Sequence, residues 1–225
     1  WALCSAMCSA ASSVIAGAMT APPIGRARVL FMTSDLELEA QKADARMLMR
    51  AERAAVVAGD AALKIIENFP LDLAKLSPVA GYWPVGGEID GRPLLAALAK
   101  AGRIVALPRM ETRAGPARFF AWGSGEALSA DAFGVPAPPP TGADLAPRLI
   151  LVPLLAFDRA GHRLGQGGGH YDRIISLHRA HGCIAAGLAF AEQEMGLAPH
   201  GAHDAHLDWV ITPKSTLPSM NRGAM

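Results

Sequence analysis

A glycine-rich stretch is the part of this chain whose residue types could do chemistry. It reads Arg163-Leu-Gly-Gln-Gly-Gly-Gly-His-Tyr-Asp-Arg173. It follows an apolar run, Leu149-Ile-Leu-Val152, which predicts a buried strand, and it leads into apolar residues at helical spacing. Bare backbone N–H groups in a loop and the N-terminus of a helix both attract negative charge. The order of strand, glycine loop and helix therefore predicts a phosphate cradle.

The charged residues at the two ends of this loop narrow the interpretation. Arg163 brings a permanent cation, and Asp172 is a suitable magnesium ligand. The loop is not a Walker motif, because no Gly-Lys-Ser/Thr follows, and its glycines do not match the dinucleotide fingerprint. The glycine count alone is as typical of a flexible turn as of a phosphate-binding loop. With the flanking charges, it favours an enzyme that handles a nucleotide or another phosphate.

Composition sets wider limits. The chain has 225 residues, a formal net charge of +1 and 51% hydrophobic residues, which suit one sizeable α/β core. Because the chain carries no large excess of positive charge, a nucleic-acid partner is not expected. The three cysteines, Cys4, Cys8 and Cys183, form no CxxC pair, which argues against a disulfide framework or a structural zinc site. We expect Cys183 to be a small buried apolar side chain.

The first 31 residues differ from the rest, because Arg26 and Arg28 are their only charged side chains. No basic residue precedes their apolar stretch, as a signal peptide requires, and the stretch is too short and too polar for a membrane span. We expect residues 1–31 to be a disordered or non-native extension. A degenerate targeting peptide is the alternative. Residues 32–225 are expected to form a single domain.

The predicted elements alternate between helices and strands. A long helix is expected from Ser34, where Ser34 and Glu37 fit a capping box, to about Val57. Further helices are predicted at 61–68 and 94–100. Strands are predicted at 79–83, 104–107, 118–122, 149–152, 184–189 and 209–212, with Pro108 ending the second of them. This alternation indicates a layered α/β fold around a mostly parallel sheet.

Three cations in the first helix are spaced four residues apart, so Lys42, Arg46 and Arg50 lie on one face. The commoner interpretation of such a row is a solvated basic stripe. The functional interpretation is a row of cations that reaches a triphosphate.

Residues 42–212 together resemble the 5-formyltetrahydrofolate cyclo-ligase family, also called the methenyltetrahydrofolate synthetase family. The most specific match is Pro153-x-x-Ala-Phe-Asp158-x-x-Gly161-x-Arg163-Leu-Gly-x-Gly-x-Gly-x-Tyr171-Asp172-Arg173. The other matches come in the family's order: Lys42-x-x-x-Arg46, Glu88-x-Asp90, Leu107-Pro108, Phe133-Gly134-Val135, Gly187-Leu-Ala-Phe190 with Gln193, and Pro199 with His203-Asp204.

The resemblance implies a fold and an activity. The fold would be a three-layer α/β/α sandwich. The activity would be the conversion of 5-formyltetrahydrofolate to 5,10-methenyltetrahydrofolate with ATP and Mg²⁺, releasing ADP and phosphate after phosphorylation of the formyl oxygen and attack by N10. It also implies a cytoplasmic monomer that acts on small molecules, with no nucleic-acid or membrane partner.

The resemblance also implies roles for individual residues. The catalytic residues would be Arg163, Tyr171 and Asp172. The ATP-binding residues would be Lys42, Arg46, Arg163, Gly165, Gln166, Gly167, Gly168, Gly169 and Tyr171. The substrate-binding residues would be Trp83, Glu88, Phe133, Gln166 and His170, and the Mg²⁺ ligands would be Asp172 and Asp204. Simpler interpretations stay open: Asp204 as a turn cap, Glu88 as a solvated side chain and Trp83 as core.

Several positions depart from the family's pattern. Gln166 stands where Tyr or Arg is frequent, His170 replaces a Tyr, and Ala137 and Gly201 stand where many members have Glu. Two alternatives therefore remain: a non-catalytic folate- or nucleotide-binding protein on this scaffold, or an ATP-dependent enzyme for another N-formyl compound.

A zinc site is not expected. The histidines near the C-terminal end of the motifs, His170, His200, His203 and His206, match no zinc spacing. Asp158 is interpreted as a structural turn residue and is left out of the candidate site.

Overall fold

The computed structural model describes residues 35–113 and 115–220. The proposed extension 1–31 and the capping residue Ser34 therefore lie outside the described residues. The helices are α1 (Asp35–Ala55), α2 (Ala61–Glu67), α3 (Arg92–Lys100) and α4 (His170–Arg179), with 3-10 turns η1 (Leu73–Lys75) and η2 (Ala191–Gln193). The strands are β1 (Val79–Ala80), β2 (Val105–Met110), β3 (Ala117–Ala121), β4 (Ser129–Ala130), β5 (Pro136–Ala137), β6 (Leu149–Pro153), β7 (Ala156–Phe157), β8 (Arg163–Leu164), β9 (Ile184–Leu188), β10 (Trp209–Ile211) and β11 (Thr216–Pro218).

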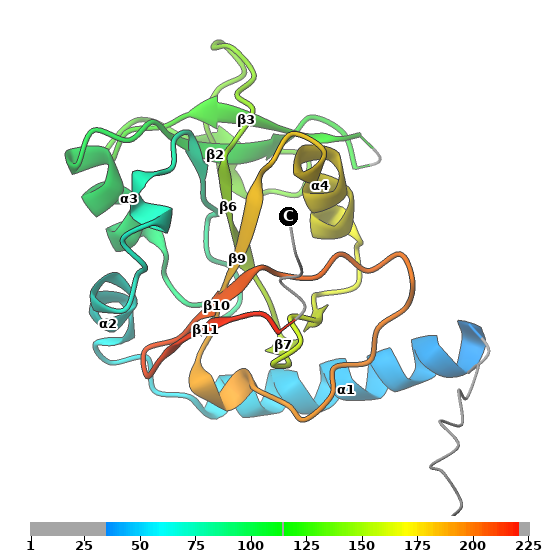
Figure 1. Cartoon of the computed structure of the whole chain (residues 1–225). Coiled ribbons are helices and arrows are strands. Elements are labelled where there is room, and N and C mark those ends of the chain that lie inside the picture. The colour runs from blue at the N-terminus through cyan, green and yellow to red at the C-terminus, as the bar shows by residue number, and fades with distance from the viewer. Residues whose placement is uncertain (1–34, 114, 221–225) are drawn as a thin grey trace, which may run out of the picture. The chain divides into compact units, whose positions relative to one another are not determined.

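Seven of these strands form one sheet in the order β11-β10-β9-β6-β1-β2-β3. The five inner strands pair in parallel, and the edge strands β11 and β3 pair antiparallel with their neighbours. Helices α2 and α3 lie on one side of the sheet and α4 on the other (Figure 1). The α/β fold around a mostly parallel sheet is thereby confirmed.

Alternation along the central strand β6 builds a core on each face of the sheet. Leu149 and Leu151 belong to the core beneath α2 and α3, whereas Ile150 and Val152 belong to the core beneath α4. All four side chains are at most 1% exposed. Burial of each contributes about 1.5–3 kcal/mol, so the apolar run predicted as a buried strand stabilises both layers.

Helix α1 belongs to neither layer and runs across the end of the sheet, below β6, β9 and β10 in Figure 1. Its residue Met49 is 4% exposed and packs against Leu155, Ala156 and Leu164 in a third small core. This contact fixes α1 against the β7–β8 hairpin, which leads directly into the glycine loop. The long helix is therefore held next to the glycine loop, although the two are far apart in sequence.

Two predicted strand boundaries were wrong by more than one residue. β1 ends at Ala80 and does not reach Trp83, and β2 does not stop at Pro108 but continues to Met110. The carbonyl of Ala106 accepts from Gly81 N, so the backbone N–H and C=O of Ala106 face β1, as do those of every second residue along β2. The imino nitrogen of Pro108, two residues on, faces the same way, past the end of β1. No ladder hydrogen bond is lost there, so a proline is tolerated.

The hairpin β7–β8 was not predicted, nor were the short strands β4, β5 and β11. The hairpin inserts between β6 and the glycine loop, and Asp158 closes its turn. Asp158 is 2% exposed and accepts from the backbone N–H groups of His162 (3.0 Å) and Ala198 (3.1 Å) and from His162 Nδ1 (3.0 Å). These bonds confirm its structural role.

Two further expectations can be compared with the described residues. Cys183 is 7% exposed, as expected, and burial raises the pKa of its thiol to about 12. No helix within residues 35–220 has the length and apolar character that crossing a membrane requires.

Candidate active site

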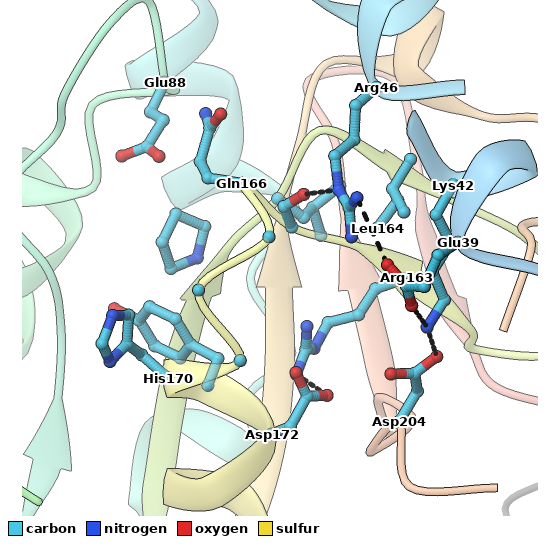
Figure 2. Close-up of a pocket in the computed structure, with 17 residues that line it drawn as sticks. Glu39, Lys42, Arg46, Glu88, Arg163, Leu164, Gln166, His170, Asp172 and Asp204 are labelled. Carbon is cyan, nitrogen blue, oxygen red and sulfur yellow. Dashed lines mark hydrogen bonds and ion pairs between the residues drawn. The ribbon is translucent and has the colours of Figure 1, made fainter. Parts of the chain in front are cut away.

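A cavity of about 330 Å³ lies where α1, the glycine loop and the start of α4 meet (Figure 2). All the residues proposed to bind ATP or metal line it, although they come from three separate regions of the chain. Its walls are formed by Glu39, Lys42, Arg46, Glu88, Pro153, Leu154, Arg163, Leu164, Gly165, Gln166, Gly167, Gly168, Gly169, His170, Tyr171, Asp172 and Asp204.

The glycine loop meets the cavity with bare backbone. Gly167 has a φ of 103°, in the region that favours glycine. A Cβ on Gly168 would lie 2.6 Å from Cδ2 of His170, so the imidazole occupies the space of a side chain. The N-cap of α4 is Gly169, which provides no side-chain cap. The first N–H groups of α4 are therefore left for another acceptor, as in helix N-termini that bind phosphate.

The basic row on α1 is not a solvated stripe. Arg46 Nε donates to the carbonyl of Gly165 at 3.2 Å, and Arg50 donates to the side chain of Gln166 at 3.1 and 3.3 Å. Lys42 is only 8% exposed. Lys42 and Arg46 thus line the cavity, whereas Arg50 is itself exposed and reaches the side chain of Gln166 in the glycine loop.

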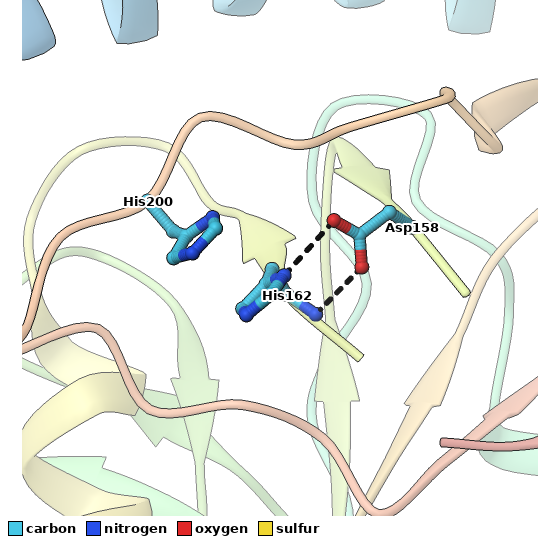
Figure 3. Close-up of side chains that lie close together, drawn as sticks. All are labelled: Asp158, His162 and His200. Atoms are coloured by element: carbon cyan, nitrogen blue, oxygen red, sulfur yellow. Dashed lines mark hydrogen bonds and ion pairs between the residues drawn. The ribbon is translucent and has the colours of Figure 1, made fainter. Parts of the chain in front are cut away.

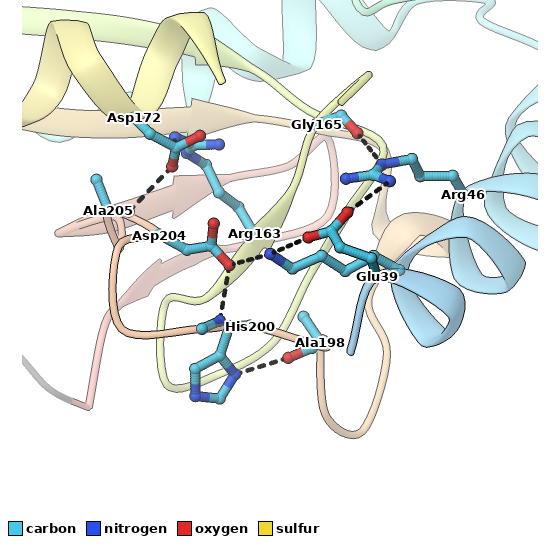
Figure 4. Close-up of polar contacts among 11 residues, drawn as sticks. Glu39, Arg46, Arg163, Gly165, Asp172, Ala198, His200, Asp204 and Ala205 are labelled. Carbon is cyan, nitrogen blue, oxygen red and sulfur yellow. Dashed lines mark hydrogen bonds and ion pairs between the residues drawn. The ribbon is translucent and has the colours of Figure 1, made fainter. Parts of the chain in front are cut away.

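Each of the most buried cations at this cavity is paired with a carboxylate (Figure 4). Lys42 Nζ lies 2.7 Å from Asp204 Oδ2, and Arg163 Nη2 lies 2.7 Å from Asp172 Oδ1. The carboxylates are also held by backbone: Asp204 accepts from Gly201 N at 2.8 Å, and Asp172 from Ala205 N at 3.0 Å. The two pairs bind α1, β8, α4 and the 201–205 segment into one charged wall.

The pairing sets the protonation states at this wall. Burial alone would lower the pKa of Lys42, but the hydrogen bond and charge of Asp204, with those of Glu39, outweigh it and raise that pKa. Burial would raise the pKa of Asp204, but Lys42, the Gly201 amide and Arg163 lower it below its ordinary value. Burial lowers the pKa of Arg163, opposed by Asp172 and Asp204. Lys42 and Asp204 are thus both ionised at neutral pH.

A second cavity of about 200 Å³ adjoins the first. It shares Glu88, Pro153, His170 and Tyr171 with the first cavity, so the two open onto common walls. Its other walls are mostly apolar and aromatic. They are Tyr82, Trp83, Val85, Pro108, Met110, Ala117, Asp131, Phe133, Val135, Pro136 and Ile174.

The polar groups of the second cavity are few. Glu88 Oε2 accepts from Val85 N at 3.0 Å, and burial raises the Glu88 pKa against the opposing charge of Arg53. The hydroxyl of Tyr82 is already used, because it donates to the carbonyl of Ile89 at 2.7 Å. Burial also raises the pKa of Tyr171 far above its ordinary value, so this phenol stays neutral.

The aromatic side chains of this cavity are braced by neighbours. Trp83 packs edge-to-face on Trp122 at 6.3 Å, and the guanidinium of Arg92 lies 4.6 Å from the centre of a Trp83 ring. Phe133 meets His170 edge-to-face at 4.9 Å. Stacked and edge-to-face contacts of this kind fix ring orientation. Trp83 thus serves core and cavity together.

The structure brings every sequence-predicted site residue to one of the two cavities. It adds residues that the sequence reasoning missed. Glu39 precedes Lys42 by three positions, which places it on the same helix face, and it pairs with Lys42 at 3.2 Å. This spacing could have revealed it. Leu154 and Tyr82 carried no signal, because an apolar residue after a strand is more often core than cavity wall.

A separate cluster lies outside both cavities, where Asp158, His162 and His200 come together (Figure 3). The imidazoles of His162 and His200 stack 3.4 Å apart with their planes 5° from parallel. Asp158 already accepts three hydrogen bonds. The lone pairs of ring nitrogens lie in the ring plane, so those of the two stacked rings lie in separate, nearly parallel planes and do not converge on one ion. The cluster fastens the 198–200 segment to the hairpin, and the absence of zinc stays a prediction.

Comparison with known proteins agrees with this geometry. A 5-formyltetrahydrofolate cyclo-ligase of Mycolicibacterium smegmatis is 35% identical over 144 residues, 60% of this chain and 73% of the relative. The Escherichia coli K12 5-formyltetrahydrofolate cyclo-ligase is 31% identical over 140 residues, 60% of this chain and 77% of the relative. The Aquifex aeolicus 5,10-methenyltetrahydrofolate synthetase structure, 26% identical, covers 82% of this chain and 95% of its own, with a TM-score of 0.70.

The family model described as the 5-formyltetrahydrofolate cyclo-ligase family matches residues 33–213, which include both cavities and every strand of the central sheet except the edge strand β11. The cradle, the paired charges and the aromatic cavity thus lie inside the matched region, and the chain belongs to the 5-formyltetrahydrofolate cyclo-ligase family.

Proposed function

We propose that this protein converts 5-formyltetrahydrofolate to 5,10-methenyltetrahydrofolate at the expense of ATP, with Mg²⁺ required. One observation carries the proposal: a charged cavity suited to phosphates shares Glu88, Pro153, His170 and Tyr171 with an aromatic cavity suited to a pterin. A γ-phosphate and a formyl group bound on either side of these shared walls would meet. Membership of the family supports the same pairing of substrates.

The nucleotide side is assigned to the charged cavity. Lys42, Arg46 and Arg163 supply cations for the triphosphate, and the backbone of residues 165–169 with the start of α4 supplies N–H donors. Gln166 is held toward the cavity by Arg50. Tyr171 closes the loop as a neutral phenol.

The residues also fit a magnesium ion. Asp172 and Asp204 both line the cavity, and hard carboxylate oxygens are the ligands that Mg²⁺ prefers. When bound, the ion would neutralise charge on the phosphate oxygens. Arg163 and Lys42, released from Asp172 and Asp204, would then pair with phosphate. Because each charge exchanges one partner for another, none of them is left buried without a counter-charge.

The substrate side is assigned to the second cavity. Glu88 accepts N–H donors of the pterin ring, and Trp83 offers a braced aromatic plane. Phe133 and His170, in contact with each other, support the aminobenzoyl portion. The Glu88 carboxylate has only one hydrogen bond from the described backbone, so its other oxygen has an acceptor site to offer.

In the reaction, the formyl oxygen attacks the γ-phosphorus and ADP leaves. N10 then attacks the activated formyl carbon, the carbon–oxygen bond breaks, and inorganic phosphate departs with the proton that N10 loses. Neither step needs a covalent intermediate on the protein. Arg163, Lys42 and the loop amides hold the transferring group in line, and positioning with charge stabilisation supplies most of the rate.

The remaining parts of the proposal concern where and with what the enzyme works. We propose small-molecule substrates, no nucleic-acid or membrane partner, a cytoplasmic location and a monomer. Gel filtration of the purified chain tests the last point. A mass twice that of the chain would contradict it.

The deciding experiment is a turnover assay. The purified protein is mixed with 5-formyltetrahydrofolate and MgATP, and the near-ultraviolet absorbance of the methenyl product is followed. A signal that requires both ATP and Mg²⁺ is expected. If a folded protein binds ATP but gives no signal, the substrate is another N-formyl compound. If ATP does not bind either, the protein is a non-catalytic binder.

A further inference from the structure

Arg53 is a buried charge outside both cavities to which the sequence pattern gave no role. It lies near the end of α1 and is 7% exposed. Its Nη2 donates to the carbonyl of Gly86 at 2.7 Å, and its Nη1 donates to the carbonyl of Leu154 at 3.4 Å. Among the described residues it makes no ion pair within 4.0 Å of a carboxylate, unlike Lys42 and Arg163 on the nucleotide side.

The segment that Arg53 holds is the turn Val85-Gly86-Gly87-Glu88. Gly86 and Gly87 both have positive φ, 58° and 79°, which is typical of a type I′ turn. The turn closes on itself, because Glu88 N donates to Val85 O at 3.3 Å while Val85 N donates to Glu88 Oε2 at 3.0 Å. Its first three residues are exposed. A self-closed, exposed turn needs an external contact to fix its place.

Arg53 supplies that contact, and its other end is anchored deep in the fold. The Leu154 carbonyl that it reaches also accepts from Gln193 Nε2 at 2.8 Å. Gln193 is 1% exposed and its side-chain oxygen accepts from Phe190 N at 2.8 Å. The turn is thus connected through Arg53 to the ends of β6 and β9. Buried networks of this kind are rigid when every member is bonded.

Electrostatics point the same way. Burial lowers the pKa of Arg53, and the charge of Glu88 is the largest influence that opposes this. Glu88 in turn faces Arg53 from α1, Tyr82 after β1 and Tyr171 from α4. Of these, only Arg53 carries a positive charge. The guanidinium therefore both locates the turn and favours the ionised form of its carboxylate.

We propose that Arg53 is a positioning residue for the substrate side, which tethers the Val85–Glu88 turn and so holds the Glu88 carboxylate at the wall shared by the two cavities. The inference deepens the proposed function and rests on it for the identity of the substrate. It assigns Arg53 no contact with ATP, because Arg53 lines neither cavity.

The test uses Arg53→Met and Arg53→Lys in the full chain, with Lys64→Met as a matched control. Lys64 is a half-exposed cation on α2 that pairs with Asp60. For Arg53→Met we expect the KM for 5-formyltetrahydrofolate to rise roughly tenfold, while the Kd for ATP changes less than about twofold. Arg53→Lys should recover part of the loss, because it keeps the charge. Lys64→Met should match the original chain.

A double variant separates positioning from general damage. Glu88→Gln removes the carboxylate that Arg53 is proposed to hold. If the proposal is right, adding Arg53→Met to Glu88→Gln raises the folate KM by less than about twofold further, because the two residues act as one unit. Fully additive effects, or equal losses of folate and ATP binding, would overturn it.

A third measurement does not depend on the substrate. Hydrogen exchange at the Glu88 amide, which closes the turn, should be faster in Arg53→Met or, if that variant does not fold, in Arg53→Lys. An unchanged exchange rate would contradict the proposed tether, whatever the enzyme's substrate is. Faster exchange in a chain that never turns over 5-formyltetrahydrofolate would leave the tether standing and reject the proposed function alone.

Discussion

The two adjoining cavities balance their charges in different ways. On the nucleotide side, Lys42 pairs with Asp204 and Arg163 with Asp172, each at 2.7 Å. On the substrate side, Glu88 has no ion pair within 4.0 Å among the described residues, and burial raises its pKa. One cavity is neutralised within itself. The other holds Glu88 among aromatic rings, together with Asp131, whose oxygens accept from the backbone N–H groups of Met110, Phe133 and Val135.

The difference follows from what each cavity is proposed to bind. A triphosphate with a metal brings charges of both signs, so a wall of ready-made ion pairs can exchange partners without exposing an unpaired buried charge. A pterin is neutral and flat, so an aromatic cavity with one acceptor gives it orientation at little electrostatic cost. Removal of a carboxylate should therefore have different consequences on the two sides.

The largest expected effect is on the paired side. In Asp172→Asn the side-chain oxygen that accepts from Arg163 and Ala205 N is retained, so the fold should persist. The metal-binding charge is lost, and kcat should fall by about a hundredfold or more. Steady-state turnover and circular dichroism check this. Asp144→Asn is the control, because Asp144 is an exposed acid that pairs with Arg118. Full activity in Asp172→Asn would show that Asp172 is not a ligand of the metal.

On the unpaired side, Glu88→Gln should act on one substrate alone. The amide keeps an acceptor oxygen but loses the charge, so the KM for 5-formyltetrahydrofolate should rise about tenfold, near 1.4 kcal/mol. The KM for ATP should stay within about twofold. Steady-state kinetics with each substrate varied in turn give both values. Equal losses would mean that Glu88 does not distinguish the two cavities.

The pairs also predict a pH dependence of stability. The pKa of Asp204 is lowered in the folded state, so its contribution is present above the ordinary pKa of about 3.9 and is lost as pH falls through the lowered value. The Lys42 pKa is raised, so its share is lost only as pH rises through that value, above about 10.4. Urea unfolding of Asp204→Asn should show a flatter acid limb than the original chain. Identical acid limbs would contradict the pairing.

The smallest effect is expected at the rim of the aromatic cavity. Phe133 is 38% exposed and contacts His170 edge-to-face. Phe133→Leu keeps apolar surface but loses the ring contact, worth about 0.5–1.5 kcal/mol. The folate KM should rise by about threefold with kcat unchanged, as initial-rate kinetics would reveal. A drop in kcat with constant KM would place Phe133 nearer to the reacting atoms than the cavity suggests.

The sequence predicted the charged half of the site better than the aromatic half. The glycines, Arg163 and Asp172 lie within ten residues, and the three cations of α1 repeat at helical spacing, so local patterns identify them. The substrate cavity collects Tyr82, Met110, Phe133 and Ile174 from four separated segments. Apolar residues of this kind are as typical of the core as of a cavity wall, and no spacing in the sequence distinguishes the two.

The sequence by itself determined the layered α/β fold, the buried central strand, the glycine loop before α4 and the cations of α1, because periodicity and residue type are local properties. Only the tertiary structure decided that Lys42 meets Asp204, that Arg53 tethers the Val85–Glu88 turn, and that two cavities share Tyr171. These contacts join residues 33 to 162 positions apart. They depend on how the layers pack, which no local pattern specifies.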